Sequence, residues 1–267
     1  MDWVKITHDA AEKVMGDLGS HYTEPVYEEA ILHDFRLNKI PHERQRNVEI
    51  IYKGYSVSTR RADCILNPLW KNEAKSEEFL LEMKARKRIE EKHLMQAQVY
   101  LVSMNIKKGL VLNFNTTTGE IDVAEVERPN KVFREDIETP IKNKVQVTES
   151  LIRSAGEEVL NYLGTEFFYG DANIYVDSVG VELRLKGLHF YTASYPILYR
   201  EHRVEEYKYD YVFQSGEVAK IFTYKKKDDI ESQVRELERY NKHFGIGKGF
   251  VLAIPEKENM EVVVRKI

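Results

Sequence analysis

The spacing of apolar residues divides the start of the chain into two helices and a hairpin. Apolar side chains recur at helical spacing over residues 9–18 and 24–37, and Pro25 suits a first helical turn. Residues 47–52 and 55–57 then favour strands, and the Lys53-Gly54 pair between them is typical of a tight turn. The pattern predicts two helices followed by a β-hairpin, whose second strand continues through residues 63–66.

Apolar runs at residues 78–83 and 109–114 predict two strands that are buried on both faces. A helix is expected between them, over about residues 88–104, and residues 120–123 form a last strand. The polar segment 67–78 predicts a long loop. Short apolar strands flanked by helices are typical of an α/β fold with a mixed sheet.

The same order of patterns begins again in the second half of the chain. Four segments have counterparts there: Leu18-Gly19 with Leu163-Gly164, 35–40 with 183–188, 61–66 with 209–213, and 106–112 with 246–252. Chance matching of common strand and helix patterns is the alternative, but the conserved order favours duplication of a whole domain. We therefore divide the chain into a domain over 1–126, a charged linker over 127–147 and a second copy over 148–267.

Composition indicates a globular protein of a reducing compartment. The chain has 267 residues, of which 42% are hydrophobic and 31% charged. No apolar run approaches the roughly 20 residues that a membrane span requires, and the amphipathic, acid-containing N-terminus does not resemble a secretory signal. The single cysteine, Cys64, lies in an apolar stretch, which predicts a buried reduced thiol. We expect a cytoplasmic protein without a membrane partner.

The net charge of −4 does not exclude a nucleic-acid partner, because binding depends on where positive charge lies. Arg60-Arg61 and residues 84–88 are basic clusters. Such runs are commonly just solvated faces. Both clusters flank the acids described next, however, and this position favours a groove that faces phosphates.

Two acids on neighbouring predicted strands define the candidate chemistry. Side chains alternate along a strand, so Glu82 and Lys84 project from one face while Met83 enters the core. Asp63 on the adjacent strand would bring a second carboxylate beside Glu82. Converging carboxylates repel unless a divalent cation lies between them, and hard oxygen ligands suit Mg²⁺ or Mn²⁺. Such a metal polarises a scissile phosphate and lowers the pKa of a bound water, which Lys84 would orient.

Polar side chains on two predicted helices extend this set. Glu24 lies at a helix start with Tyr27 one turn later, and Gln96 and Tyr100 are related by four residues. The alternative interpretation of Glu24 is a first-turn acid that the helix dipole favours. For Gln96 and Tyr100, the alternative is that they are ordinary surface residues. His93 is interpreted as a polar surface group.

In this order and spacing, these residues resemble the GxxExxY family of the PD-(D/E)XK nuclease superfamily. The matching segments are 24–28 (E-x-x-Y), 52–54 (a hairpin), 61–63 (the metal aspartate), 81–85 (E-x-K), 96–101 (Q-x-x-x-Y-L) and 109–114 (a closing strand). The resemblance covers about residues 9–122. His21 stands where the family has its leading glycine, which puts the geometry of that turn in doubt.

The resemblance implies a restriction-endonuclease-like core that cleaves phosphodiester bonds with Mg²⁺ or Mn²⁺. Asp63, Glu82 and the Met83 carbonyl would hold the metal, and Glu24 would assist as a further metal or water ligand. Lys84 would serve the attacking water. The implied catalytic residues are therefore Asp63, Glu82, Lys84 and Glu24.

The resemblance also implies a nucleic-acid substrate, with DNA favoured. Gln96 and Tyr100 would contact the substrate strand, and we assign Tyr27 and Arg61 to the substrate-binding side as well. An RNA-directed nuclease stays open, as does a non-catalytic nucleic-acid-binding or scaffolding protein that keeps a nuclease fold. A homodimer or a protein partner is also left open.

The second copy departs from the pattern at its proposed site. Asp210 is kept, but Thr223 stands opposite Glu82 in our sequence matching, and Ala172 opposite Glu24. Lys225 falls opposite Lys84. Because one carboxylate without its partner binds a divalent cation poorly, we expect a degenerate nuclease fold there.

Overall fold

The computed structural model describes residues 1–68, 77–129, 145–165, 172–257 and 259–267. The chain forms two compact units. The first comprises Met1–Ile51 and Ser58–Val132, and the second comprises Tyr52–Val57 and Phe133–Ile267. Most of the predicted linker over 127–147 and of the predicted loop over 67–78 lies outside the described residues.

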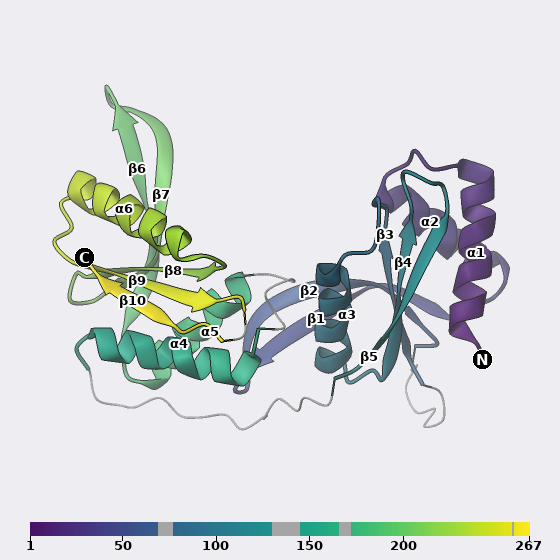
Figure 1. The fold of residues 1–267 in the computed structure, drawn as a ribbon, viewed down its shortest axis with the longest axis horizontal. Helices are drawn as coiled ribbons and strands as arrows, with labels where there is room; N and C mark the ends of the chain where they lie inside the picture. The colour runs from purple at the N-terminus through teal and green to yellow at the C-terminus, as the bar shows by residue number, and fades with distance from the viewer. Residues whose placement is uncertain (69–76, 130–144, 166–171, 258) are drawn as a thin grey trace. The chain divides into compact units, whose positions relative to one another are not determined.

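The first unit carries a five-stranded mixed sheet with helices on both faces (Figure 1). Its elements are α1 (Trp3–Leu18), α2 (Glu24–Leu37), β1 (His42–Tyr52), β2 (Tyr55–Leu66), β3 (Phe79–Lys84), α3 (Glu91–Ser103), β4 (Lys108–Phe114) and β5 (Ile121–Glu127). The sheet order is β1-β2-β3-β4-β5. Strands β3 and β4 are parallel and are connected through α3, whereas the other described pairings are antiparallel.

Local sequence explains where these elements begin and turn. The Asp2 side chain accepts a hydrogen bond from the Lys5 amide and so caps α1, which therefore begins earlier than the predicted residue 9. Helix α2 has the predicted bounds, with Pro25 in its first turn. Between β1 and β2, Lys53 and Gly54 both have positive φ, as a two-residue hairpin turn requires.

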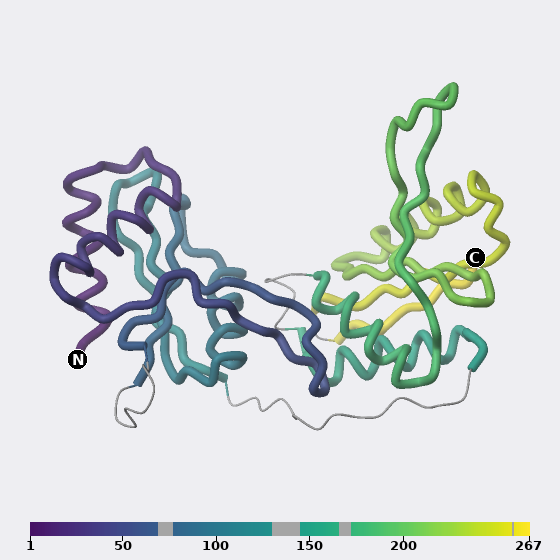
Figure 2. The backbone as a smooth tube through the Cα atoms, turned by 180° about the vertical axis from the view of Figure 1, so that it is seen from behind, coloured from purple at the N-terminus to yellow at the C-terminus, as the bar shows by residue number. Residues whose placement is uncertain are grey.

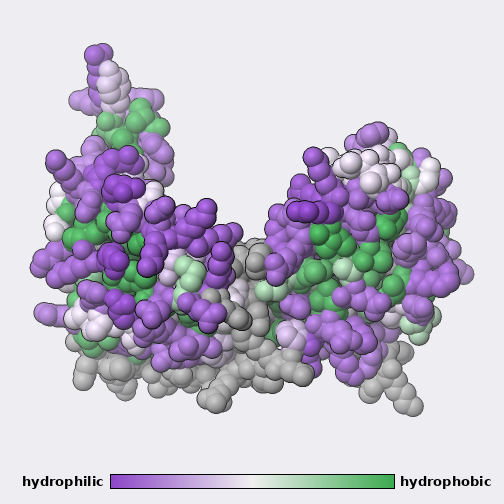
Figure 3. Space-filling model, in the orientation of Figure 1, coloured by the Kyte–Doolittle hydropathy of each residue, from purple (hydrophilic) through white to green (hydrophobic). Residues whose placement is uncertain are grey.

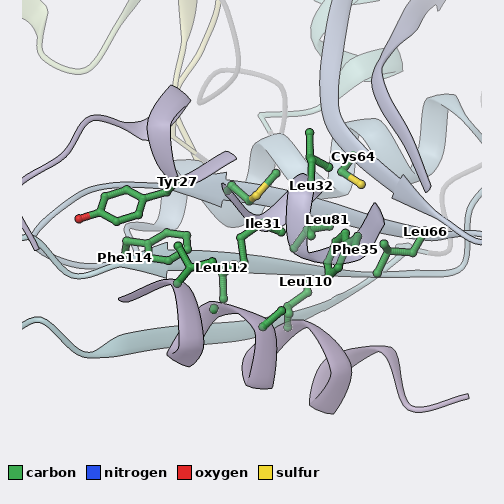
Figure 4. Close-up of a cluster of buried hydrophobic side chains, with 14 of the residues drawn as sticks. Tyr27, Ile31, Leu32, Phe35, Cys64, Leu66, Leu81, Leu110, Leu112 and Phe114 are labelled. Carbon is green, nitrogen blue, oxygen red and sulfur yellow. The ribbon is translucent and has the colours of Figure 1, made fainter. Parts of the chain in front are cut away.

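The apolar core of the first unit lies between the sheet and the α1–α2 layer. Figure 4 shows α2 side chains, among them Tyr27 and Phe35, against the β-strand residues Leu81, Leu112 and Phe114. Cys64 belongs to this cluster, which confirms the predicted buried, free thiol; burial raises its pKa far above the ordinary value. Leu81 and Met83 therefore face the core, and the alternate residues of β3 face α3.

The second unit repeats this order of elements around another five-stranded mixed sheet. Its elements are α4 (Glu149–Leu163), α5 (Asn173–Leu185), β6 (Phe190–Tyr199), β7 (His202–Phe213), β8 (Val218–Tyr224), α6 (Lys227–Phe244), β9 (Gly249–Pro255) and β10 (Val263–Lys266). The sheet order is β10-β9-β8-β7-β6, again with its parallel pair, β8 and β9, joined through a helix. The predicted mixed sheet flanked by helices is confirmed in both units.

Packing within the second unit is rich in aromatic rings. Tyr207 stacks on Tyr240 with ring centroids 3.7 Å apart, and Tyr209 lies edge-on to Tyr207. These rings join β7 to α6 on one face of the sheet.

Among the described helices of the chain, none is long and apolar enough to cross a membrane.

Gly109 provides a test of how closely β3 and β4 approach. It pairs with Leu80, and a Cβ added to it would lie 2.8 Å from the Leu80 Cβ and 2.9 Å from the Leu80 carbonyl oxygen. We expect Gly109→Ala to lower the free energy of unfolding by about 1–3 kcal/mol, measured by urea denaturation. Gly16→Ala is the control, because its Cβ would meet no described atom within 4 Å, and a helical alanine should gain about 0.5–1 kcal/mol. Equal effects at the two positions would contradict this account.

Candidate active site

Asp63 and Glu82 are locked together by reciprocal bonds between β2 and β3. The antiparallel register pairs Cys64 with Leu81, so Asp63 and Glu82 are the next opposed residues. The Asp63 amide donates to Glu82 Oε1 over 3.2 Å, and the Met83 amide donates to Asp63 Oδ2 over 2.8 Å. Glu82 therefore uses Oε1 to hold the neighbouring strand and keeps Oε2 for the site, whereas Asp63 Oδ2 both holds β3 and faces Lys84.

The Lys84 ammonium lies among four acceptor oxygens. Its Nζ is 2.9 Å from the Met83 carbonyl oxygen and 3.4 Å from Glu82 Oε2. It is also 3.6 Å from Asp63 Oδ2 and 3.8 Å from Glu24 Oε1, which the first turn of α2 supplies. The structure thus brings together five residues that were predicted from the sequence to form one site.

Burial sets the electrostatics of this cluster. The Glu82 side chain is 1% exposed, and burial, reinforced by the nearby Asp63 charge, raises the pKa of Glu82. Burial likewise raises the pKa of Glu24, against the opposing influence of Lys84. For Lys84, burial acts to lower the pKa, but the surrounding carboxylates outweigh it and raise the pKa above its ordinary value. The ammonium therefore compensates acids that would otherwise be costly to bury.

Gln96 and Tyr100 lie against the same acid from α3. Gln96 Nε2 donates to Glu82 Oε2 over 3.4 Å and to the Tyr100 hydroxyl over 3.0 Å. Tyr100 is 4% exposed, and burial raises its pKa to about 12, so the phenol stays protonated at neutral pH. In this structure the pair supports the Glu82 carboxylate, and Gln96 is the more accessible of the two.

Tyr27 and Arg61, which we assigned to substrate binding, lie elsewhere. The Tyr27 ring is fully buried and stacks on Phe114, and its hydroxyl donates to the Gly19 carbonyl. This bond joins the end of α1 to α2 and indicates a structural contribution. Arg61 is exposed on β2, where it donates to Gln45 Oε1 over 3.3 Å.

Two features of the site were not foreseen. Asn113, fully buried on β4, accepts from the Arg86 amide and donates to the Arg86 carbonyl, at 2.9 and 3.1 Å. It thereby fixes the turn after β3, which carries the exposed residues Arg86, Lys87 and Arg88. In the sequence, Asn113 lies inside the apolar run that predicts a strand buried on both faces. A polar side chain buried there needs hydrogen-bond partners, and this was the signal that could have identified it.

The interpretation of His93 as a polar surface group was wrong, because the residue is buried. Its Nδ1 accepts from the Glu90 amide over 3.1 Å, forming part of a capping box at the start of α3. Burial lowers the pKa of His93. The Glu90–His93 spacing was a signal for this cap.

The donor set around Lys84 fits a hard divalent cation. Three carboxylates and one backbone carbonyl offer the oxygen ligands that Mg²⁺ and Mn²⁺ prefer. One positive charge already lies among them, so the field of the site suits a cation. Within the described part of the chain, the carboxylate oxygens of Glu24, Asp63 and Glu82 do not all lie within 4.8 Å of one another. Three residues on α1, namely His8, Asp9 and Glu12, do have ligand atoms that close together. Closing them on an ion would require the Lys84 ammonium to move aside.

The second unit has a different charge arrangement at the corresponding place. Asp210 Oδ2 accepts from the Ile221 amide over 2.7 Å, as Asp63 does from Met83. The equivalent of Glu82 is therefore Lys220, and that of Lys84 is Phe222. Our sequence matching, which placed Thr223 and Lys225 there, was three residues out of register.

This correction changes the chemistry expected of the second unit. Lys220 Nζ lies 3.5 Å from Asp210 Oδ2. Burial raises the pKa of Asp210, and the Lys220 charge partly offsets that rise. An aspartate neutralised by a lysine from the next strand has little need of a metal.

One comparison with known proteins concerns the first unit. Residues 1–126 match the family model of the PD-(D/E)XK nuclease superfamily. No curated protein matches the chain. A crystal structure of a protein named SSO0001 is similar at 21% identity and a TM-score of 0.30, over 40% of this chain and 50% of that chain.

The buried hydroxyl of Tyr27 leads to a stability prediction. Tyr27→Phe removes the bond to the Gly19 carbonyl and should lower the free energy of unfolding by about 1 kcal/mol, measured by urea denaturation. Tyr22→Phe is the matched control, because that ring is 48% exposed and should leave stability unchanged. A Tyr27→Phe variant of normal stability that bound DNA more weakly would instead support the substrate-binding assignment.

Proposed function

We propose that this chain is a metal-dependent nuclease that hydrolyses phosphodiester bonds in DNA, with its catalytic centre in the first unit. The observation that carries the proposal is the set of oxygens around Lys84, in a segment that matches a nuclease superfamily.

The ligands for the metal are Asp63, Glu82 and the Met83 carbonyl, with Glu24 as a further metal or water ligand. When bound, Mg²⁺ or Mn²⁺ supplies a Lewis acid for the scissile phosphate and lowers the pKa of a bound water. Asp63 and Glu82 are held for this task by their backbone bonds, which restrict the carboxylates before substrate arrives. Such preorganisation lowers the cost of assembling the site.

Lys84 acts as a positive charge and hydrogen-bond donor rather than as a base. Its raised pKa keeps the ammonium protonated at neutral pH. In that state it can orient the attacking water and stabilise the charge that develops on the phosphate. Gln96, with Tyr100 behind it, holds the Glu82 carboxylate, and because it is only half-buried it is the residue of this pair proposed to contact a substrate strand.

The turn after β3 is the proposed contact for the nucleic-acid backbone. Arg86, Lys87 and Arg88 are exposed there, and Asn113 anchors the turn from below. Positive side chains that follow a catalytic strand suit a phosphate chain leaving the site. Arg61 is exposed on β2 and remains a candidate for the same role.

The second unit is proposed to be a duplicated copy of the fold that has lost its catalytic set. The element order, the parallel strand pair and the aspartate bond to the strand beside it all recur. Lys220 and Phe222 replace the acid and lysine of the E-x-K strand. Such a unit would contribute binding surface or assembly.

Substitution of the two equivalent aspartates tests this division. Asp63→Asn should lower the cleavage rate roughly 100-fold or more, because the site loses a metal-ligating charge. Asp210→Asn removes the matching carboxylate of the second unit and should leave the cleavage rate unchanged. Both variants are assayed on plasmid DNA with Mg²⁺ and with EDTA, after circular dichroism shows normal folding. Equal losses in both variants would show that the second unit takes part in catalysis.

Replacement of the central lysine separates chemistry from metal binding. Lys84→Met should lower kcat roughly 100-fold, while calorimetric titration should show Mn²⁺ affinity kept or increased, since the competing ammonium is gone. Lys92→Met, at an exposed lysine on α3, is the control for both measurements. Weaker metal binding as the sole defect would contradict the role given to Lys84.

The substrate class is tested on plasmid, linear and single-stranded DNA and on RNA, each with Mg²⁺, Mn²⁺ or EDTA. Metal-dependent cleavage of DNA is the expected result. A folded wild-type protein that bound these nucleic acids without cleaving them would favour the non-catalytic alternative. Preferential cleavage of RNA would change the substrate and keep the chemistry.

A further inference from the structure

Within the second unit, a hairpin turn binds a buried carboxylate. Residues 52–57, the turn between β1 and β2 and its flanks, belong to this unit. The Tyr52 hydroxyl donates to Glu182 Oε1 over 2.7 Å, and Lys53 Nζ lies 2.7 Å from the same oxygen. The Tyr52 ring also packs edge-on against Tyr162 of α4. A tyrosine and a cation from one turn thus satisfy an acid of α5 that is 2% exposed.

The β6–β7 hairpin ends in the same combination of residues and backbone geometry. Its turn residues Arg200 and Glu201 have φ of 48° and 64°, as Lys53 and Gly54 have 46° and 81°. Both are two-residue turns of the type that hairpins favour. The Arg200 guanidinium lies over the Tyr199 ring at 5.3 Å, and Lys53 lies over Tyr52 at 5.9 Å.

The two turns differ in what covers them. Tyr52 is fully buried, whereas Tyr199 is 62% exposed. Leu198 and Val204, at the same tip, are 54% and 56% exposed. Figure 2 shows the hairpin extending well beyond the rest of its unit, and Figure 3 shows hydrophobic residues gathered on it.

The first unit has the counterpart of the receiving acid. Tyr27 and Tyr175 are equivalent, because each donates to the carbonyl of the glycine that ends the preceding helix. Asp34 follows Tyr27 by seven residues, as Glu182 follows Tyr175. Each acid also contacts the residue one turn later on its helix, Asn38 at 2.9 Å and Lys186 at 3.8 Å.

Beside Asp34 lies a cavity of about 520 Å³, open to solvent, between α1 and the end of α2. Its lining includes Lys13, Asp34, Asn38 and Ile40. Lys13, whose side chain is 59% exposed, forms an ion pair with Asp34, and Asp9 and Lys39 also line the cavity. The cavity therefore offers a carboxylate and a partly apolar wall to an incoming side chain.

We propose that the β6–β7 tip of one chain docks into the Asp34 cavity of a second copy of this chain. Tyr199 would enter the cavity with its hydroxyl toward Asp34, and Arg200 would add its charge to the same acid. The interaction repeats, between copies, the one that Tyr52 and Lys53 make with Glu182.

A second copy suits these features for three reasons. Tip and cavity both remain uncovered in the single chain that the structure describes. Each copy carries one tip and one cavity, so a two-fold pair makes two identical contacts and closes. The tip is also unsuited to nucleic acid, because Arg200 and Arg203 are balanced by Glu201, Glu205 and Glu206.

Cysteine pairing between differently labelled chains tests the contact directly. A mixture of full-length Lys13→Cys and Arg200→Cys chains should form a mixed disulfide at least about tenfold faster than Lys13→Cys with Tyr191→Cys. Tyr191 is also exposed, at 56%, but lies at the other end of β6, so it is the control. Cys64 is buried and should not compete. Equal rates in the two mixtures would overturn the proposal.

The double variant Lys13→Cys/Arg200→Cys distinguishes a second copy from the same chain. Disulfide-linked dimers are expected, and their formation should slow on dilution. A disulfide within one chain, formed at a rate independent of concentration, would overturn the choice of a second copy.

Oligomeric state provides an independent measurement. Light scattering after size exclusion should show a concentration-dependent dimer for the wild type. Arg200→Glu should raise the dimer dissociation constant about tenfold or more, because it places a second acid beside Asp34, whereas Tyr191→Ala should leave it unchanged. A wild-type protein that stays monomeric throughout would contradict the proposal, whatever the outcome of the cleavage assays.

Discussion

The first unit depends on one buried charge arrangement, in which the Lys84 ammonium compensates the acids of Glu24, Asp63 and Glu82. Charges removed from water are costly unless each is paired and hydrogen-bonded. The reciprocal bonds between β2 and β3 meet part of this requirement, since each carboxylate accepts from a backbone amide of the other strand. The ammonium meets the rest. The arrangement constrains strand register, because a shift of one residue would turn Glu82 into the apolar core and Met83 toward α3.

One face of the sheet in the first unit therefore packs in the core, and the other face carries the candidate site. One face of β3 contributes Leu81 and Met83 to the packing beneath α1 and α2, which holds the strand in place. The other carries the charged side chains toward α3, where Gln96 and Tyr100 support Glu82. The second unit has its own apolar packing and an Asp210 bond to β8, and Lys220 and Phe222 stand where the first unit has Glu82 and Lys84. Fold and chemistry are separable here because the core lies on the face opposite the site.

Hairpin turns provide a second recurring element. An aromatic and a basic side chain at a tight turn can together satisfy a buried acid. Glu182 is served in this way by Tyr52 and Lys53. Asp34 pairs with Lys13 of α1, and a cavity lies beside it. The proposed docking of the β6–β7 tip rests on the difference between these two acids.

By itself, the sequence determined the helices, the strands, the mixed sheet and the candidate residues Asp63, Glu82 and Lys84. Local periodicity and the alternation of side chains carry that information. It did not determine the buried positions of Tyr27 and His93, the anchoring by Asn113, or the equivalence of Lys220 with Glu82. Those depend on which strands pair, in which register, and on what the opposite element contributes. Such contacts join residues far apart in the chain, so only the tertiary structure decided them.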